Sequence, residues 1–132
     1  MQAALNLPAA GFPVMASRPM VYTRQDGVRS AAVVYIGLPF ALPPYPDGTP
    51  AWGCQVQTIG IGNDRIMTSR GPDTAQAVIY ALVLAGTLCN GSVVAAQIDW
   101  SAMPNFGFPT VPPGAPDNGG DPFILQLSPI FN

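Results

Sequence analysis

The 132-residue sequence contains no histidine, no lysine and no glutamate, so its charged side chains are five arginines and seven aspartates. Histidine is the side chain that most readily moves protons near neutral pH, and lysine and glutamate replace it when burial shifts their pKa. An enzyme would therefore depend on aspartate, cysteine, tyrosine or a hydroxyl group. No arrangement of those residues forms a recognisable catalytic site, so we expect a protein that is not an enzyme and has no cofactor.

Charge of either sign is scarce. Charged residues make up 9% of the chain, whereas about 25% is usual for a globular protein. With a formal net charge of only −2, electrostatic repulsion between copies is weak, which favours a homo-oligomer or a dedicated protein partner. The arginines are spread along the chain and offset by aspartates, so nucleic acid is not an expected partner.

Metal-ligating and membrane-spanning patterns are also missing. Cys54 and Cys89 stand alone, and without histidine a zinc site would need carboxylates as its other ligands, so we interpret both as buried thiols. The acidic pair Asp117 and Asp121 lacks the further ligands of a calcium loop and is interpreted as part of a turn. The apolar run 77–89 is shorter than the ~20 residues of a membrane span. No signal-peptide pattern is present at the N-terminus, which predicts a cytoplasmic location.

Alternating and β-branched residues predict an antiparallel sheet. Residues 20–24 and 30–37 are separated by Gln25-Asp26-Gly27, a strong hairpin signal. Residues 52–59 place Trp52 and Cys54 on one face and alternate with glutamines on the other, and residues 65–69 can return beside them. A short fifth strand is predicted at 93–100. Residues 38–50 contain five prolines and are predicted to be an extended, functional loop.

One long helix is predicted over residues 73–89. Proline precedes Asp73, whose carboxylate can cap the first turn together with Gln76, and Asn90-Gly91 ends the helix. The stripe expected to face the sheet consists of Ala75, Val78, Ile79, Leu82, Gly86 and Cys89. The other faces of this helix are apolar as well, so it needs cover on its second side from the C-terminal segment or another chain.

These elements predict an α+β fold with two layers. A mainly antiparallel sheet of four or five strands packs against one long helix, and an irregular segment rich in proline and glycine follows. We expect a flexible leader over residues 1–19, the α+β domain over 20–111, and an apolar tail over 112–132 that docks on the domain or on a neighbouring subunit.

Two groups of residues are candidates for binding a partner. Large aromatic side chains near loops can anchor an interface, although they can equally form a small second core beneath those loops. The polar candidates are expected on the open face of the sheet. The complete set is Tyr45, Trp52, Gln55, Gln57, Arg65, Arg70, Trp100, Phe106 and Phe108.

Three motifs carry a resemblance to a known family. They are Ile36-Gly37-Leu38-Pro39, the helix entry from Gly71 to Ala77, and Trp100 followed by Phe106-Gly107-Phe108-Pro109. Together they resemble a family of small uncharacterised bacterial proteins over residues 20–111. The resemblance implies a compact antiparallel sheet with one helix and a likeness to immunity-type proteins of bacterial toxin systems. The hydrophobic tail beyond residue 111 departs from that family's pattern.

The sequence therefore favours a non-enzymatic protein-binding module, with an immunity-like inhibitor of a bacterial toxin as its most concrete form. The first alternative is a self-assembling or structural subunit, which the neutral composition and the apolar helix also fit. The second alternative is a small ligand-binding protein or an aspartate-based enzyme, which would need a polar site inside an apolar pocket.

Overall fold

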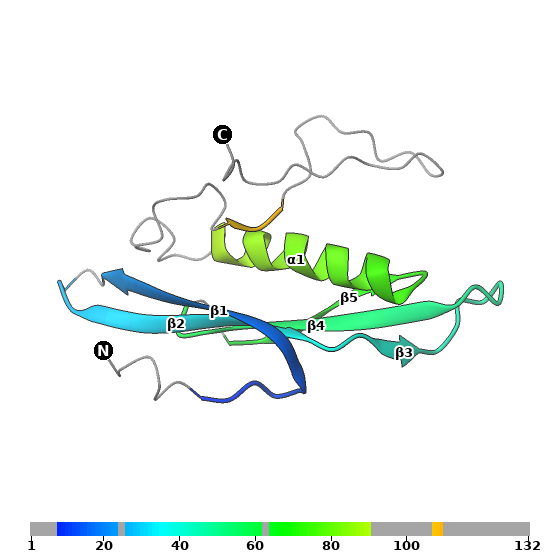
Figure 1. Ribbon diagram of the computed structural model, residues 1–132, viewed down its shortest axis with the longest axis horizontal. Helices are drawn as coiled ribbons and strands as arrows, with labels where there is room; N and C mark the ends of the chain where they lie inside the picture. The colour runs from blue at the N-terminus through cyan, green and yellow to red at the C-terminus, as the bar shows by residue number, and fades with distance from the viewer. Residues whose placement is uncertain (1–7, 24–25, 62–63, 91–106, 110–132) are drawn as a thin grey trace.

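A computed structural model of the chain describes residues 8–23, 26–61, 64–90 and 107–109. Five antiparallel strands form an open sheet, and a single helix of the described residues packs on one side of it (Figure 1). The α+β prediction is thereby confirmed. In chain order the elements are β1 (Val14–Thr23), β2 (Arg29–Gly37), β3 (Phe40–Leu42), β4 (Ala51–Ile59), β5 (Ile66–Gly71) and α1 (Thr74–Asn90).

The sheet is an antiparallel meander, as the sequence predicted. β1 pairs with β2, and β2 and β3 follow one another along the same edge of β4, because Ile36 pairs with Val56 and Phe40 pairs with Gly53. β5 pairs with the other edge of β4. The predicted fifth strand at 93–100 and the apolar tail 112–132 lie outside the described residues. No helix in the described part of the chain is long and apolar enough to cross a membrane.

The first strand is longer than predicted. β1 begins at Val14 instead of Met20, so residues 14–19 belong to the sheet and the expectation of a flexible leader over them is wrong. Pro19 is compatible with this strand because β1 pairs only with β2 among the described strands, and proline is tolerated where no ladder donor is needed.

Part of the predicted proline loop is a hairpin. Within it β3 pairs with the start of β4, and the chain reverses between Tyr45 and Thr49, where Tyr45 N donates to Thr49 O at 2.9 Å. Gly48 N donates to Tyr45 O at 2.8 Å, and Gly48 has φ 88°, a left-handed conformation that suits glycine. Asp47 stabilises the reversal, because its carboxylate accepts from Thr49 N at 2.9 Å. Hydrogen bonds from the Thr49 side chain and backbone lower the pKa of Asp47.

The helix begins where the capping pattern predicted. Asp73 Oδ1 accepts a hydrogen bond from Gln76 N at 2.7 Å, and Asp73 O accepts from Ala77 N at 3.1 Å. The carboxylate thus satisfies an otherwise unpaired amide of the first turn and lies at the positive end of the helix dipole.

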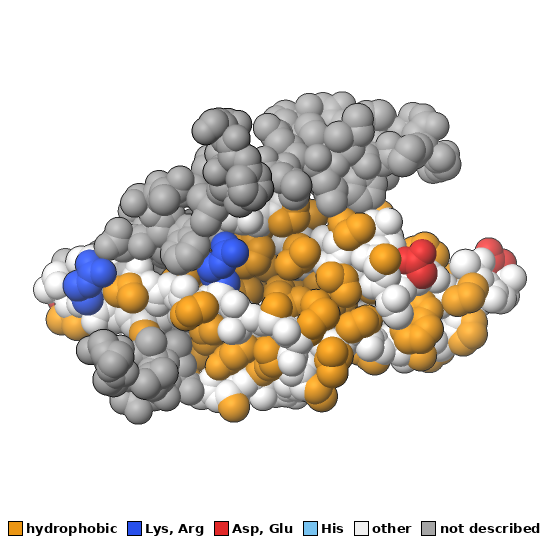
Figure 2. Space-filling model, viewed as in Figure 1, with side chains coloured by type: hydrophobic (Ala, Val, Ile, Leu, Met, Phe, Trp, Pro, Cys, Tyr) orange, Lys and Arg blue, Asp and Glu red, His pale blue; other side chains and the backbone are white. Residues whose placement is uncertain are grey.

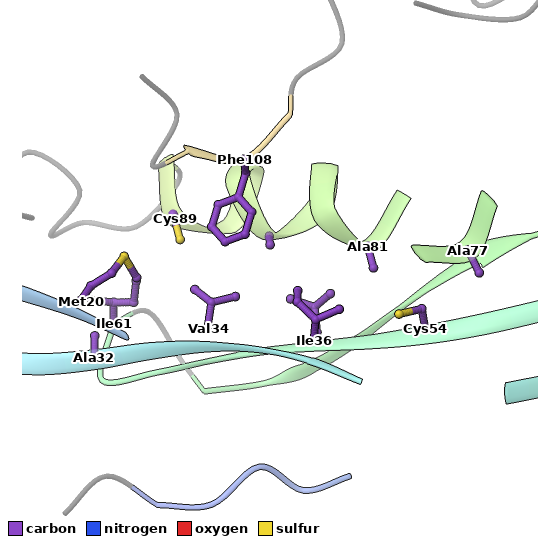
Figure 3. Close-up of a cluster of buried hydrophobic side chains, with 12 residues drawn as sticks. Met20, Ala32, Val34, Ile36, Cys54, Ile61, Ala77, Ala81, Cys89 and Phe108 are labelled. Atoms are coloured by element: carbon purple, nitrogen blue, oxygen red, sulfur yellow. The ribbon is translucent and has the colours of Figure 1, made fainter. Parts of the chain in front are cut away.

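Small side chains of α1 face the sheet (Figure 3). Ala77, Ala81, Ala85 and Cys89 recur at every fourth position and are fully buried. The predicted facing stripe is therefore wrong in its centre, although its members Gly86 and Cys89 are buried and Val78 and Leu82 pack against the core. Ala75 is exposed in that stripe, and its larger members Val78, Ile79 and Leu82 are only half-buried. Apart from one polar stripe, Gln76, Tyr80 and Thr87, the helix is apolar, so hydrophobicity excludes one face but does not choose among the others. Small residues do, since they let the helix approach the sheet closely.

The close approach of helix and sheet is visible in two contacts. A Cβ added to Gly71 would lie 2.7 Å from Ala77 N, closer than real Cβ atoms come to a neighbour. The buried Ser69 hydroxyl lies 2.7 Å from Ala77 O and 3.2 Å from Cys54 O, so it joins β5 to both the helix and β4. α1 packs mainly on β4 and β5, and the core continues beneath it into β2 through Val34 and Ile36.

Candidate functional site

The face of the sheet opposite α1, called here the open face, carries the N-terminal segment, residues 8–13. Figure 1 shows this blue segment running along the sheet before the chain reverses into β1. Strand register places Tyr35, Gln57 and Ile66 side by side on the open face, because Tyr35 pairs with Gln57 and Gln57 pairs with Ile66. Residues that were expected in a mobile leader therefore contact the middle of the sheet.

Three hydrogen bonds hold the N-terminal segment, and each uses one of its backbone groups. Gly11 N donates to Gln57 Oε1 at 3.0 Å. The Tyr35 hydroxyl donates to Pro8 O at 3.2 Å, and Leu38 N donates to Pro13 O at 3.1 Å. Gln57 also donates through Nε2 to Asp64 O at 2.9 Å, so its side chain links the segment to the β4–β5 connection.

Two glycines of the sheet each pack against an aromatic ring on the open face. A Cβ added to Gly37 would lie 2.9 Å from the Phe12 ring, and one added to Gly53 would lie 2.9 Å from the Phe40 ring. Each ring thus occupies the space that a side chain would otherwise fill, and it restores packing that the glycine lacks. Phe12 and Phe40 are both half-buried.

The polar candidates from the sequence share this face in part. Gln55 pairs with Thr68, and Arg70 pairs with Gly53, so Gln55, Gln57 and Arg70 point to the open face. Arg65 is exposed immediately before β5. Of these residues, Gln57 already binds the chain's own N-terminal segment.

The aromatic candidates are not gathered in one place. Phe108 is 5% exposed and belongs to the main core on the helix side, with the Arg18 guanidinium carbon 4.9 Å from its ring centroid. Trp52 is half-buried at the margin of the same core. These two are therefore core residues, but of the main core and not of a second core beneath the loops. Tyr45 is 37% exposed in the hairpin turn. Trp100 and Phe106 lie outside the described residues.

The two thiols lie in the core far apart along the helix axis (Figure 3). The Cys54 thiol donates to Gly37 O at 3.2 Å. Burial raises the pKa of both thiols, and that of Cys89 to about 11 although the Arg18 cation partly opposes the shift. At neutral pH both are therefore held as thiols, which are poor nucleophiles. Among the described residues no group of three potential ligands could hold a metal ion.

The raised pKa of Cys89 predicts a loss of stability at alkaline pH. The unfolded thiol releases its proton near pH 9.0, while the folded thiol keeps it until about pH 11. Between these values the folded state binds more protons, so the free energy of unfolding falls as pH rises. Urea unfolding at pH 8.5 and pH 10.5 should show a smaller fall for Cys89→Ala than for the wild type. An equal fall in both proteins would contradict the assignment.

Three residues with large exposed apolar side chains lie where β1 begins and β2 ends. Val14 is 43% exposed, Met15 43% and Leu38 52%. They are neighbours because Val14 pairs with Gly37, and Leu38 N bonds to Pro13 O. We call Val14, Met15 and Leu38 the apolar corner.

Figure 2 shows hydrophobic side chains across the middle of the viewed face, with arginines to the left and acidic side chains to the right.

No known family model, curated protein or solved structure matches this chain. The resemblance to immunity-type proteins therefore stays a hypothesis, and the function has to be argued from the surface itself.

Sequence reasoning missed both the N-terminal segment and the apolar corner. Residues 8–13 contain two prolines, a glycine and two alanines, so they show no strand or helix periodicity, and their hydrogen bonds come from the backbone. One available signal was the tripeptide Gly-Phe-Pro, which occurs at 11–13 and again at 107–109. The first places Phe12 on the open face and the second places Phe108 in the core on the helix side.

Proposed function

We propose that this protein is a non-enzymatic protein-binding module that acts in the cytoplasm and contacts its partner through the apolar corner. The observation that supports this is the exposure of three large apolar side chains, Val14, Met15 and Leu38, where β1 begins and β2 ends. Scattered apolar residues are normal on a monomer, whereas a contiguous exposed patch is typical of an interaction site. An inhibitor resembling the immunity proteins of bacterial toxin systems is the most concrete form of the proposal.

The surroundings of the apolar corner fit a protein partner better than a charged ligand. Interface centres are depleted in charged residues and depend on a few buried apolar or aromatic anchors. None of the residues in the corner is charged, and Phe12 and Phe40 lie half-buried beside it on the open face. A partner that covered the corner would gain the burial of several large apolar groups with little charge desolvation.

Self-association is the second candidate function, because net charge and charged fraction are both low. The sheet edges favour a closed assembly over an open-ended one. β1 carries Pro19 in its middle and a register shift between Val14 and Ala16. β5 has six residues, and exposed arginines lie beside it and within it. Proline, irregular pairing and charge are devices that prevent edge-to-edge pairing of strands.

The partner proposal predicts that Leu38→Asp removes binding. Burying Leu38 contributes about 1.5 to 3 kcal/mol, so its replacement by a charge should weaken capture of the partner at least about tenfold. The matched control is Val28→Asp, since Val28 is 50% exposed at the opposite end of the β1–β2 hairpin. Quantitative pull-downs of both variants and the wild type, followed by mass spectrometry, make the comparison.

A partner retained by the wild type and by Val28→Asp but lost by Leu38→Asp would support the apolar corner as the interface. Equal retention by all three proteins would contradict it. Sedimentation distinguishes self-association from binding of a different protein. If the wild type forms an assembly and Leu38→Asp sediments as a monomer, the apolar corner binds a second copy of the chain.

A further inference from the structure

The contacts of the N-terminal segment define a peptide-binding site on the open face. Its walls are Tyr35, Gly37, Leu38, Gln57 and Ile66, called here the open-face site. We propose that this site binds a peptide that contains the pair Gly-Phe and bends there as residues 8–13 do, that residues 8–13 occupy it within the same chain, and that a matching segment of the partner protein replaces them. The inference rests on the proposed protein-binding function and adds the chemistry of the partner's segment.

The polar part of the site recognises the backbone of the bound segment, which bends at Gly11 and Phe12. It offers the Tyr35 hydroxyl to the carbonyl of residue 8, Gln57 Oε1 to the N–H of residue 11, and Leu38 N to the carbonyl of residue 13. None of these three bonds depends on a side chain of the bound segment. The same groups can therefore bind any chain whose backbone follows the path of residues 8–13.

Side-chain selection comes from the apolar part of the site. The ring of Phe12 lies over Gly37, where an added Cβ would come within 2.9 Å of it, so the floor accepts a flat aromatic group. At the preceding position an added Cβ would lie 2.8 Å from Ile66 Cδ1. The Ile66 side chain can rotate to make room for an alanine at position 11. A larger branched side chain at that position would break the contact between Ile66 and the segment. The aromatic ring is thus the main determinant and the glycine the second.

The present occupant is held weakly enough to be replaced. The hydrogen bonds from Tyr35 and to Gln57 are exposed to solvent, and Pro8, Ala9, Gly11 and Pro13 are exposed. Segments with few buried apolar contacts and exposed backbone bonds detach at low free-energy cost. Its attachment to the chain still gives it an effective concentration in the millimolar range, so it competes with any added peptide.

A partner protein is favoured over a second copy by the position of the apolar corner. Two copies that exchanged residues 8–13 would make the same contacts at the open-face site that each makes alone. A partner that inserts its own segment can also cover Val14 and Leu38, because Val14 follows Pro13 directly and Leu38 N is one of the site's donors. The added burial supplies the affinity that displacement of the resident segment requires.

The test uses the full chain with Phe12→Ala, which empties the aromatic position, and the labelled peptide Pro-Ala-Ala-Gly-Phe-Pro. Fluorescence anisotropy should show saturable binding to the variant at least about tenfold tighter than to the wild type, whose own segment competes. Replacing the peptide's phenylalanine by alanine should weaken binding at least about tenfold. Replacing its glycine by valine should weaken it several-fold. Gly11→Val weakens the resident segment by a second route and should bind the peptide several-fold more tightly than the wild type does.

The double variant Phe12→Ala/Gly37→Ala is the matched control. A Cβ at position 37 would occupy the space that the phenylalanine ring of the peptide needs, so peptide binding should be abolished. Absence of peptide binding to Phe12→Ala and to Gly11→Val, with circular dichroism unchanged from the wild type, would overturn the proposal. Equal binding of the alanine-substituted peptide would also overturn it. A wild-type dimer that the peptide dissociates would overturn the partner assignment in favour of a second copy. If Leu38→Asp loses the partner and no variant binds the peptide, the apolar corner is supported as the interface and the open-face site is rejected.

Discussion

Replacing Gly60 by alanine is expected to destabilise the protein by roughly 3 kcal/mol or more, because two separate penalties act at this position. Gly60 has φ 92°, a conformation that side chains with a Cβ rarely adopt. The added Cβ would also lie 2.6 Å from Ala31 O and 3.0 Å from Ala32 Cα. Both neighbouring atoms belong to the backbone of β2, so they cannot move aside without disturbing the centre of the sheet.

Gly48→Ala is the matched control for Gly60→Ala. Gly48 has φ 88°, nearly the same backbone conformation, but no atom lies within 4 Å of an added Cβ. Its substitution should cost only the backbone term, roughly 1 to 2 kcal/mol. Urea unfolding of the two variants measures the difference, which reports the collision with β2. Equal losses of stability would mean that β2 does not lie against Gly60 as the structure places it.

Local sequence patterns predicted the structure correctly where a position requires one particular type of residue. Asp73 caps the helix, and Gly27 has φ 84° in the predicted Asp-Gly turn. Alternation in β4 also gave the correct faces, because Cys54 and Val56 are buried under the helix while Gln55 and Gln57 lie on the open face. In these places the pattern and the physical requirement coincide.

Other features could not be predicted from periodicity or residue type. β3 lies among prolines, which normally argue against a strand. It nevertheless forms, as a short strand that pairs with the edge of β4. The N-terminal segment binds through backbone groups, which every residue possesses. The candidate binding residues were chosen by type, so Phe108 was grouped with surface aromatics although it is buried in the core.

The orientation of α1 is the case with the largest structural consequence. A stripe chosen by hydrophobicity selected Ala75 and Leu82, whereas the structure buries the alanines at 77, 81 and 85 and exposes Ala75. When most faces of a helix are apolar, the closest packing against a sheet is given by the smallest side chains, because dispersion contacts fall off within an ångström. The polar stripe of Gln76, Tyr80 and Thr87 excludes one face of this helix, and the size of the side chains determines which of the apolar faces is buried.

This orientation predicts that one substitution has very different effects on stability at two positions of the same helix. Ala81→Leu places three extra carbon atoms between α1 and the sheet, where Ala81 is fully buried above Ile36 (Figure 3). Overpacking of this kind should lower the free energy of unfolding by about 1 to 3 kcal/mol. Ala75→Leu adds the same atoms at an exposed position and should change stability by less than about 0.5 kcal/mol.

Alanine and leucine are both strong helix formers, so the comparison is nearly free of differences in helix propensity. Thermal and urea unfolding of the two variants would measure the effect, and circular dichroism would establish that each remains helical. A larger loss for Ala75→Leu than for Ala81→Leu would show that the helix is rotated toward the stripe expected from hydrophobicity. The small residues would then face away from the sheet, and the hydrogen bond from Ser69 to Ala77 O could not form as described.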